Sequence, residues 1–579
     1  MIGRSLIRAQ ARSSSQVRSP TGFSLDKIAD RAADQPDIAA PASRMTPWYK
    51  NAVFYCLDVE TFCDADGDGV GDFLGLGRKL PYLAELGVDC VWLMPFYATA
   101  NRDDGYDVTD HCAVDPRLGT LHDFDDFVRA AARLDIRVIV DLVVNHTSID
   151  HPWFQAARSD PHSPRRAYYV WSADRPAHTR ERLVFPGFQQ ESWSWDAQAG
   201  AWYHHRFYEH EPDLNMDCAE VREEIRRIVA FWLGRGISGY RVDAVPFIIE
   251  RLGPDGRTSH EVFADLSELR RMSDAVNRDA VLIGEANVPP PAVSSYFGSG
   301  DRLHVMLDFL MAQRLFLALA THDAGPIVET LTGRPDIPTE CTWGEFLRNH
   351  DELDLARLSE SERAQVIAAF GPRTDMQIYG RGLRRRLATM LGGDRNRIAL
   401  AFSLQFTLPG CPVIFYGNEI GMGEELALPE RLPVRTPMQW TDARGAGFSN
   451  APEERFVRPL VRDEPFSAAH VNVDAQQQDP ASLLNVVRGL IAARKQCLEL
   501  GVGSCTILPA DPPVLMHRCD YGSDSVLFVH NLLNAPRTVR LEGADTREAA
   551  VVVASSGVER DPCRREIDLP AYGYAWLRL

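Results

Sequence analysis

The sequence lacks a long apolar run, a paired spacing of cysteines and an excess of positive charge. No stretch approaches the ~20 consecutive apolar residues of a membrane-spanning helix. The 11 cysteines are scattered and odd in number, which predicts reduced thiols in a reducing compartment such as the cytoplasm, and no metal-binding thiol cluster. The formal net charge of −18 argues against nucleic acid or an anionic membrane as a partner.

The overall composition is that of an ordinary globular protein, but the composition of the N-terminal segment differs from that of the rest of the chain. The 579 residues are 45% hydrophobic and 25% charged, which predicts several domains or one large barrel with additions. The first residues carry arginines and serines but no acid and no apolar core. We expect residues 1–44 to be a disordered leader, with a transit peptide as the alternative.

Apolar, strand-like runs follow, and most are separated by helix-like stretches. They are Ala52–Phe62, Val88–Phe96, Ile136–Asn145, Gly236–Val245, Ala280–Ala286, Leu303–Phe309, Trp343–Asn349 and Cys411–Tyr416. Near-continuous apolar strands alternating with helices indicate a parallel sheet that is buried on both faces. This number of units predicts an α/β fold, a closed (β/α)8 TIM barrel.

Two further regions do not fit the repeating unit. The long, aromatic-rich segment after the third strand predicts an inserted subdomain over residues 147–215. The short alternating runs near the C-terminus predict an antiparallel β-sandwich over residues 501–579. The barrel itself then comprises residues 45–146 and 216–500.

The run Gly239–Pro246 carries a charged pair, Arg241 and Asp243, inside an apolar strand. Residues two apart on a strand share a face, so the guanidinium can hold the carboxylate ionised. A structural ion pair explains this spacing about as well as a catalytic carboxylate does. Other strand ends add polar residues that converge at the same mouth of a barrel. These are Tyr106, Asp107, Asn145, His146, Glu285, Asn287, His350 and Asp351.

The acids Asp243, Glu285 and Asp351 suit retaining glycoside hydrolysis. In that chemistry one carboxylate attacks the anomeric carbon, and a second, kept protonated by less polar surroundings, protonates the leaving oxygen. The third would hold sugar hydroxyls, and His146 and His350 would hydrogen-bond to them. The sequence therefore predicts a convergent polar site in place of isolated structural residues.

An acidic loop follows the first strand. Residues Asp64, Asp66, Asp68 and Asp72 alternate with glycines and Val70, which is the oxygen-ligand spacing of a calcium loop. The twelfth position of the loop is Gly75 where an EF-hand has Glu. We expect a structural Ca²⁺ site with these five residues as ligands and no organic cofactor, the alternative being an acidic turn without metal.

These motifs, together with Gly87–Pro95, Pro212–Asn215 and Gly410–Gly421, resemble glycoside hydrolase family 13, the α-amylase family. The resemblance extends over the chain from about residue 46. It implies Asp243 as nucleophile, Glu285 as acid/base and Asp351 as transition-state stabiliser. It also implies a set of substrate-binding residues: Tyr106, Asp107, His146, Arg241, His350, Arg435, Phe247 and Asn287.

Within the family, Arg435–Trp440 and Pro212–Asn215 resemble the branch of oligo-1,6-glucosidases, α-glucosidases and trehalose synthases. In that branch Arg435 is similar to an arginine that pairs with Asp107 and seals the pocket, which implies small α-glucosides as substrates. The resemblance is strongest to trehalose synthases, which interconvert maltose and trehalose.

The chain departs from the synthase pattern at Phe247, Ala356 and Val288, where synthases carry polar residues that help close the pocket. An α-glucosidase or transglucosidase is therefore the alternative function. A non-catalytic barrel that serves as a binding partner is a remote third reading. The sequence leaves oligomeric state and linkage preference open.

Overall fold

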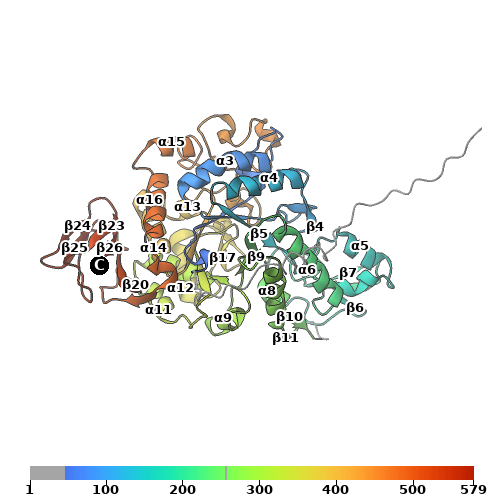
Figure 1. Ribbon diagram of the computed structural model, residues 1–579. Helices are drawn as coiled ribbons and strands as arrows, with labels where there is room; N and C mark the ends of the chain where they lie inside the picture. The colour runs from blue at the N-terminus through green and yellow to red at the C-terminus, as the bar shows by residue number, and fades with distance from the viewer. Residues whose placement is uncertain (1–45, 254–256) are drawn as a thin grey trace, which may run out of the picture. The chain divides into compact units, whose positions relative to one another are not determined.

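The computed structural model describes residues 46–253 and 257–579, and Pro47–Leu579 form one compact unit (Figure 1). The leader expected over residues 1–44 lies outside the described residues. Within the described ranges, no helix combines the length and the apolar character that crossing a bilayer requires.

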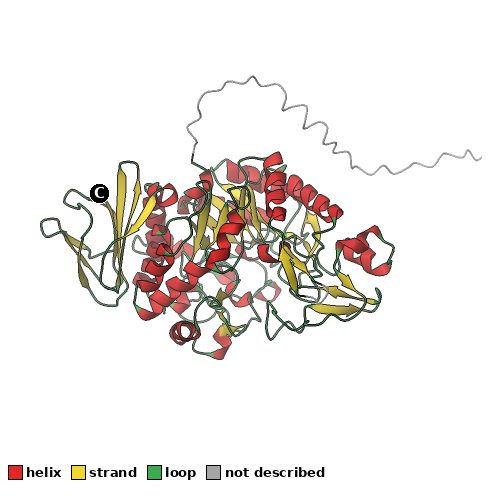
Figure 2. Ribbon diagram, turned by 90° about the horizontal axis from the view of Figure 1, so that it is seen from below, coloured by secondary structure: helices red, strands yellow, loops and turns green. Residues whose placement is uncertain are grey.

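A closed barrel of parallel strands lies at the centre. In spatial order the strands are β1 (Phe54–Leu57), β18 (Cys411–Phe415), β14 (Thr342–Phe346), β13 (Val305–Leu307), β12 (Val281–Gly284), β9 (Gly239–Val242), β5 (Arg137–Leu142) and β2 (Cys90–Leu93). Each lies within one of the predicted runs or overlaps it, so the predicted barrel is confirmed. Nearly every strand residue is buried, because helices cover the outside and side chains fill the inside (Figure 2).

The strands are shorter than the apolar runs, and this difference forms the mouth of the barrel. β9 ends at Val242 and β12 at Gly284, so Asp243 and Glu285 are the first residues beyond their strands. The two strands pair in parallel, with Gly239 beside Val281. A Cβ on Gly239 would lie 2.1 Å from the carbonyl oxygen of Val281, at a positive φ of 142°, so glycine permits this close approach.

Helices form the outer layer. The principal ones are α3 (Phe73–Leu86), α4 (Leu121–Ala132), α6 (Ala219–Leu233), α8 (Ala264–Val276), α9 (Pro290–Phe297), α10 (Phe309–Thr321), α11 (Gly325–Thr332), α12 (Glu360–Phe370), α14 (Arg395–Thr407) and α16 (Leu483–Lys495). Thr120 and Ser359 begin α4 and α12 with complete capping boxes, which the sequence spacing provides.

Three excursions from the barrel carry the loops of the site. The hairpin β3 (Tyr97–Thr99) and β4 (Val108–Val114) follows β2. Between β5 and β9 lie α5 (Pro152–Ser159) and a small antiparallel sheet of β6 (Trp171–Ser172), β8 (Ala201–His204) and β7 (Trp193–Asp196). After β14 comes a sheet of β15 (Leu353–Asp354), β17 (Gly382–Leu383) and β16 (Gln377–Ile378).

The C-terminal region is a two-sheet sandwich, as predicted. One sheet has the order β19 (Ser504–Ile507), β20 (Val514–Tyr521), β21 (Asp524–Asn531), β26 (Tyr574–Arg578) and β23 (Ala550–Ala554). The other consists of β22 (Arg537–Arg540), β25 (Glu566–Leu569) and β24 (Glu559–Asp561). The sheets enclose their own core, whereas Phe528 and Trp576, on the opposite face, belong to the same hydrophobic cluster as the barrel core. Figure 1 shows the strands of this larger sheet next to α14 and α16.

Candidate active site

One cavity at the carboxyl ends of the barrel strands collects the three predicted catalytic acids. Asp243, Glu285 and Asp351 all line it, and its volume is about 460 Å³. They follow β9, β12 and β14, three strands of one barrel. Parallel strands present their carboxyl ends at the same mouth, so residues distant in sequence converge there.

Arg241 is buried and contacts the carboxyl groups of three acids. Its guanidinium contacts Asp141 of β5, Asp243 at 2.6 Å and Glu285 at 2.7 Å. The predicted pairing with Asp243 is therefore confirmed, but the same arginine serves two further acids. Only 1% of its side chain is exposed. One buried positive charge thus stands among three carboxyl groups.

The pKa of Asp243 lies above its usual value, because Arg241 lowers it by less than burial and the neighbouring acids raise it. Burial raises it most, and Asp141 and Asp351 raise it further, so that it lies at about 6 despite the opposing charge of Arg241. Arg241 favours the ionised form, as expected, but burial and the neighbouring acids outweigh its effect on the pKa. Asp243 is deprotonated at pH 7, but it titrates close to neutrality.

Glu285 responds in the same direction. Burial raises the pKa of its carboxyl group, and the negative charges of Asp243 and Asp351 add to the rise against the attraction of Arg241. The backbone N–H of Ala244 donates to Glu285 Oε2 at 3.0 Å and fixes the group beside Asp243. A raised pKa suits a carboxyl group that gives a proton to a leaving group.

Asp351 has the opposite environment. Arg431 and Arg435 both donate to its Oδ1, at 2.9 and 2.8 Å, and His350 Nε2 lies 3.2 Å from Oδ2. Burial alone would raise its pKa, but His350 and the two arginines hold it well below the usual value. These contacts therefore favour the ionised form of Asp351.

The predicted pair of Arg435 with Asp107 is wrong. Arg435 instead donates to Asp104 at 2.5 Å, to Asp351 and to the carbonyl of His350. On the cavity wall itself, Arg431 pairs with Asp103 at 2.7 Å. The physical reason is that the loop after β3 presents two adjacent acids, so each arginine of the distant loop takes its own partner.

Asp107 lies behind the wall. One of its oxygens accepts from Thr99 Oγ1 at 2.8 Å and from the backbone N–H of Arg102 at 3.0 Å. It is fully buried and does not line the cavity. Asp107 therefore shapes the loop that carries Asp103 and Tyr106, while its other oxygen, Oδ2, is buried without a hydrogen-bond partner, and its role in substrate binding stays a prediction.

The remaining predicted residues lie at the cavity or directly behind it. Tyr106 lines it and shares a hydrogen bond of 2.8 Å with His350 Nε2. His146 lines it too, and its buried Nε2 has no hydrogen-bond partner, which leaves that nitrogen available to a ligand hydroxyl. Asn287 and Phe247 line the wall near Glu285.

Several lining residues were missed by sequence reasoning. They are Asp103, Glu211, Glu352, Asp354, Arg381 and Arg431. Glu352 follows Asp351 directly and Arg431 precedes Arg435 by one helical turn, so adjacency to predicted residues was the available signal. The others lie on loops whose approach to the cavity depends on tertiary packing.

Only some of the acids in the predicted calcium loop form a cluster of carboxylate oxygens. Carboxylate oxygens of Asp64, Asp66 and Asp68 lie within 4.8 Å of one another, which suits a hard cation. Asp72 is not in this cluster, because its oxygens cap α3 through the N–H of Gly75 and bind the N–H of Ala65. The N–H of Val70 donates to Asp68 at 2.8 Å, and its carbonyl as a ligand stays a prediction.

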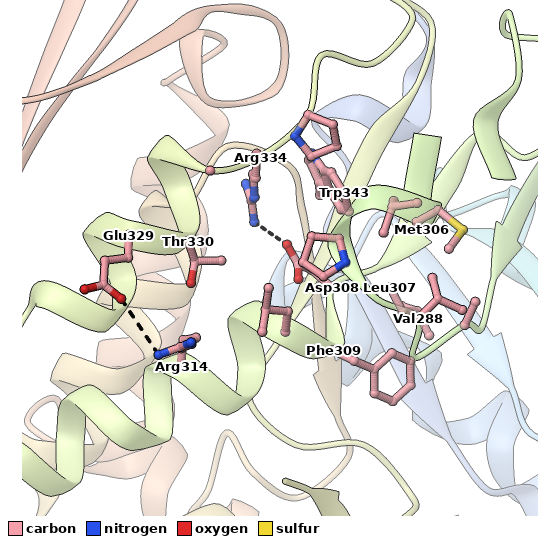
Figure 3. A pocket seen from close by; sticks show the side chains of 16 residues that line it. Val288, Met306, Leu307, Asp308, Phe309, Arg314, Glu329, Thr330, Arg334 and Trp343 are labelled. Atoms are coloured by element: carbon pink, nitrogen blue, oxygen red, sulfur yellow. Dashed lines mark hydrogen bonds and ion pairs between the residues drawn. The ribbon is translucent and has the colours of Figure 1, made fainter. Parts of the chain in front are cut away.

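A second cavity lies beside the first, between the barrel and helices α10 and α11 (Figure 3). Its volume is about 170 Å³, and it shares Ala286, Val288 and Phe309 with the first cavity. Its charged residues form two ion pairs, Arg334 with Asp308 and Arg314 with Glu329. None of the predicted catalytic acids lines it, so the first cavity is the candidate active site.

Comparison with known proteins agrees with this geometry. The family described as the alpha-amylase catalytic domain matches residues 59–368 and 383–502, and the C-terminal domain of sucrose hydrolase-like proteins matches residues 523–578. The crystal structure of the trehalulose synthase MutB from Pseudomonas mesoacidophila MX-45 is similar with a TM-score of 0.74. It is 25% identical, and the match covers 92% of this chain and 100% of that one.

Two curated relatives are more similar in sequence. A trehalose synthase/amylase TreS from Mycobacterium tuberculosis is 41% identical over 545 residues, which are 92% of this chain and 90% of that protein. A trehalose synthase from Thermus thermophilus is 44% identical over 488 residues; the match covers 84% of this chain but half of that longer protein. With the catalytic-domain match over most of its length, the chain belongs to the alpha-amylase family.

Proposed function

We propose that the chain is a retaining enzyme for small α-glucosides, and that its main reaction is the interconversion of maltose and trehalose. The observation that carries the proposal is the single cavity lined by Asp243, Glu285 and Asp351 with their divided electrostatics. The choice of maltose and trehalose is supported by the relatives named trehalose synthase at 41% and 44% identity.

In the proposed first step, the ionised carboxylate of Asp243 attacks the anomeric carbon of the bound glucose. The bond from that carbon to the leaving oxygen breaks, and Glu285 gives its proton to this oxygen. Asp351, held ionised by its cations, would accept hydrogen bonds from ring hydroxyls and stabilise the positive charge that develops. The product of the step is a glucosyl ester of Asp243 and a free glucose.

In the second step the freed glucose turns and presents a different hydroxyl. Glu285, now ionised, takes the proton from that hydroxyl as its oxygen attacks the ester carbon, and the Asp243 carboxylate is released. Isomerisation requires that glucose re-attacks before water does, so the wall of the cavity must stay closed. Arg431 and Asp103 form one part of this wall in the structure.

Hydrolysis or transfer to another sugar is the second candidate, and one observation favours it. Phe247, Val288 and Ala356 all line the cavity, at positions where the synthase pattern is polar. An apolar or small side chain there cannot tie the wall together by hydrogen bonds. Water or a second sugar would then compete for the glucosyl ester.

Product analysis of purified protein with maltose separates these functions. Trehalose as main product supports the proposal, free glucose or longer sugars support the second candidate, and absence of turnover overturns both. Asp243→Asn, purified in parallel, is the matched control for contaminating activity.

We also propose a structural Ca²⁺ ion at Asp64, Asp66 and Asp68, supported by the convergence of their oxygens. For its compartment we propose a reducing one such as the cytoplasm. All 11 cysteines are free, and most of them are buried, which supports reduced thiols.

A further inference from the structure

A group of metal-binding side chains lies far from the acids, on the first two strands of the C-terminal sandwich. Cys505 on β19 pairs directly with Cys519 on the antiparallel strand β20, and His517 precedes Cys519 by two residues. Residues directly opposite and residues two apart point to the same face of a sheet. One ligand atom from each side chain lies within 4.8 Å of the other two.

The histidine of this group has one ring nitrogen already in use and one without a partner. Its Nε2 lies 2.9 Å from the carbonyl oxygen of Thr407, which can only accept, so the Nε2–H donates. The neutral ring then has its lone pair on Nδ1, and this buried atom has no hydrogen-bond partner. A backbone carbonyl that fixes the ring in this manner is the usual support of a metal-binding histidine.

The group lies where the sandwich meets the barrel. Thr407 belongs to α14, so His517 already connects β20 to a barrel helix. His517 and Cys519 are 0% and 1% exposed, whereas Cys505 is half-buried at the edge of the group. Cys505 therefore offers a path by which an ion could enter.

We propose that Cys505, His517 and Cys519 bind one zinc ion, or a soft divalent cation of similar chemistry, with water as the fourth ligand. Two thiolates and an imidazole select soft or borderline metals, in contrast to the oxygen ligands of the acidic loop. Tetrahedral bond lengths place such atoms ~3.5–3.8 Å apart, so a group that lies within 4.8 Å needs to contract by at most about 1.3 Å. The sequence-based expectation of no thiol cluster is thereby revised, because strand pairing joins cysteines that are not close in sequence.

The ion would tie the terminal strand pair to the barrel. On binding, two thiol protons leave to solvent and two metal–sulfur bonds form, with no oxidant or reductant involved. Since the ion would bind only the folded arrangement, it would stabilise the contact between sandwich and barrel. This role is independent of the glucoside chemistry proposed above.

The first test uses the full-length wild-type protein. Purified under reducing conditions and dialysed against Zn²⁺, it should retain about one equivalent of zinc per chain. Replacement by Co²⁺ should give the sulfur-to-cobalt charge-transfer band of thiolate ligation. Absence of stoichiometric metal together with absence of this band overturns the proposal, as does a Cys505–Cys519 disulfide in the reduced preparation.

The second test identifies the ligands without relying on any one variant folding. In the wild type, zinc should protect Cys505 and Cys519 together from alkylation, read by mass spectrometry, while exposed Cys563 reacts at an unchanged rate. Cys505→Ser and His517→Gln should each lower zinc affinity at least about tenfold. Cys563→Ser, also in the sandwich, is the matched control and should keep full metal content. Alkylation of Cys505 and Cys519 that zinc does not slow contradicts the proposal.

Discussion

The two sides of the active-site cavity contain the same type of side chain in opposite electrostatic surroundings. On the side of β9 and β12, Asp243, Glu285 and Asp141 share a single arginine, Arg241. We term this the shared side. On the side of β14, Asp351 contacts His350, Arg431 and Arg435, and the two arginines also pair with Asp103 and Asp104. We term this the clamped side.

The groups that contact each carboxyl, more than burial, divide the roles of the three acids. Burial is the largest influence on the pKa of Asp243, Glu285 and Asp351 alike, and in each case it raises the value. On the shared side the cation cannot offset this rise, and the pKa stays high. On the clamped side the contacts from His350, Arg431 and Arg435 reverse it. The pKa values of Asp243 and Glu285 are therefore raised, which suits proton exchange, whereas Asp351 is held as the anion.

The largest expected effect comes from removing the nucleophile of the shared side. Asp243→Asn should reduce turnover of maltose by more than about 1000-fold, or ~4 kcal/mol, because an amide cannot form the glucosyl ester. The measurement is the initial rate with maltose, with circular dichroism to check the fold. Asp442→Asn, an exposed site, is the matched control. A rate above about one hundredth of wild type for Asp243→Asn contradicts its role as the nucleophile.

The shared side could be predicted from sequence and much of the clamped side could not. Arg241 and Asp243 lie two residues apart, so strand geometry alone places them together. The barrel strands were likewise visible as apolar runs, because burial on both faces requires them. The contact between Arg431 and Asp103 spans 328 residues and joins two irregular loops. No local periodicity encodes such a contact, and the wrong pairing of Arg435 with Asp107 arose there.

The next largest effect should come from weakening the clamped side. Arg431→Ala leaves Asp351 and Asp103 each without one ion-pair partner, a loss worth ~3–5 kcal/mol for a buried pair. We expect the pKa of Asp351 to rise, and kcat/KM and the free energy of unfolding to fall. Steady-state kinetics and chemical denaturation measure these changes.

Two further variants control this test. Arg431→Lys should restore part of kcat/KM, since it keeps the charge but not the two-partner geometry. Arg462→Ala removes an exposed ion pair with Glu453 and should cost less than ~1 kcal/mol. If Arg431→Ala behaves like Arg462→Ala, the clamp on Asp351 has no catalytic value.

Removing calcium should affect neither side of the cavity directly. Chelation should lower the melting temperature, because an ion at 100 times its Kd contributes about 2.7 kcal/mol to the folded state. Asp66→Asn combined with Asp68→Asn should abolish this response, while kcat/KM below the melting temperature stays unchanged. An equal melting temperature with and without chelator, in protein shown to contain no metal, contradicts the calcium proposal.

The pH dependence of kcat/KM should report the two catalytic acids of the shared side. Asp243 must be ionised to attack, and its pKa is about 6, so the rate should fall tenfold per pH unit below that value. Glu285 must be protonated, so the rate should fall again as pH rises through its raised pKa. Because Asp243 and Glu285 interact, the apparent pKa values of the acidic and basic limbs belong to the pair and not to either residue alone. The pKa of Asp351 lies well below its usual value, so Asp351 should not contribute to the acidic limb. A profile that stays flat down to pH 4 would contradict the assignment of that limb to Asp243.

The smallest expected effect concerns the wall that spans both sides. Phe247 follows the shared side on α7 (Val245–Ile248), and Ala356 follows the clamped side after β15. With neither able to close the wall by hydrogen bonds, water should compete for the glucosyl ester, and free glucose should form a substantial fraction of the product from maltose. Phe247→Tyr combined with Ala356→Glu should restore polar closure, and a gain of ~1.4 kcal/mol for re-attack would raise the ratio of trehalose to glucose tenfold.

Chromatography of the products measures this ratio, and Phe247→Leu with Ala356→Ser is the control for altered volume alone. If wild type already yields trehalose with negligible glucose, these two positions do not limit closure, and the apolar wall is sufficient to exclude water.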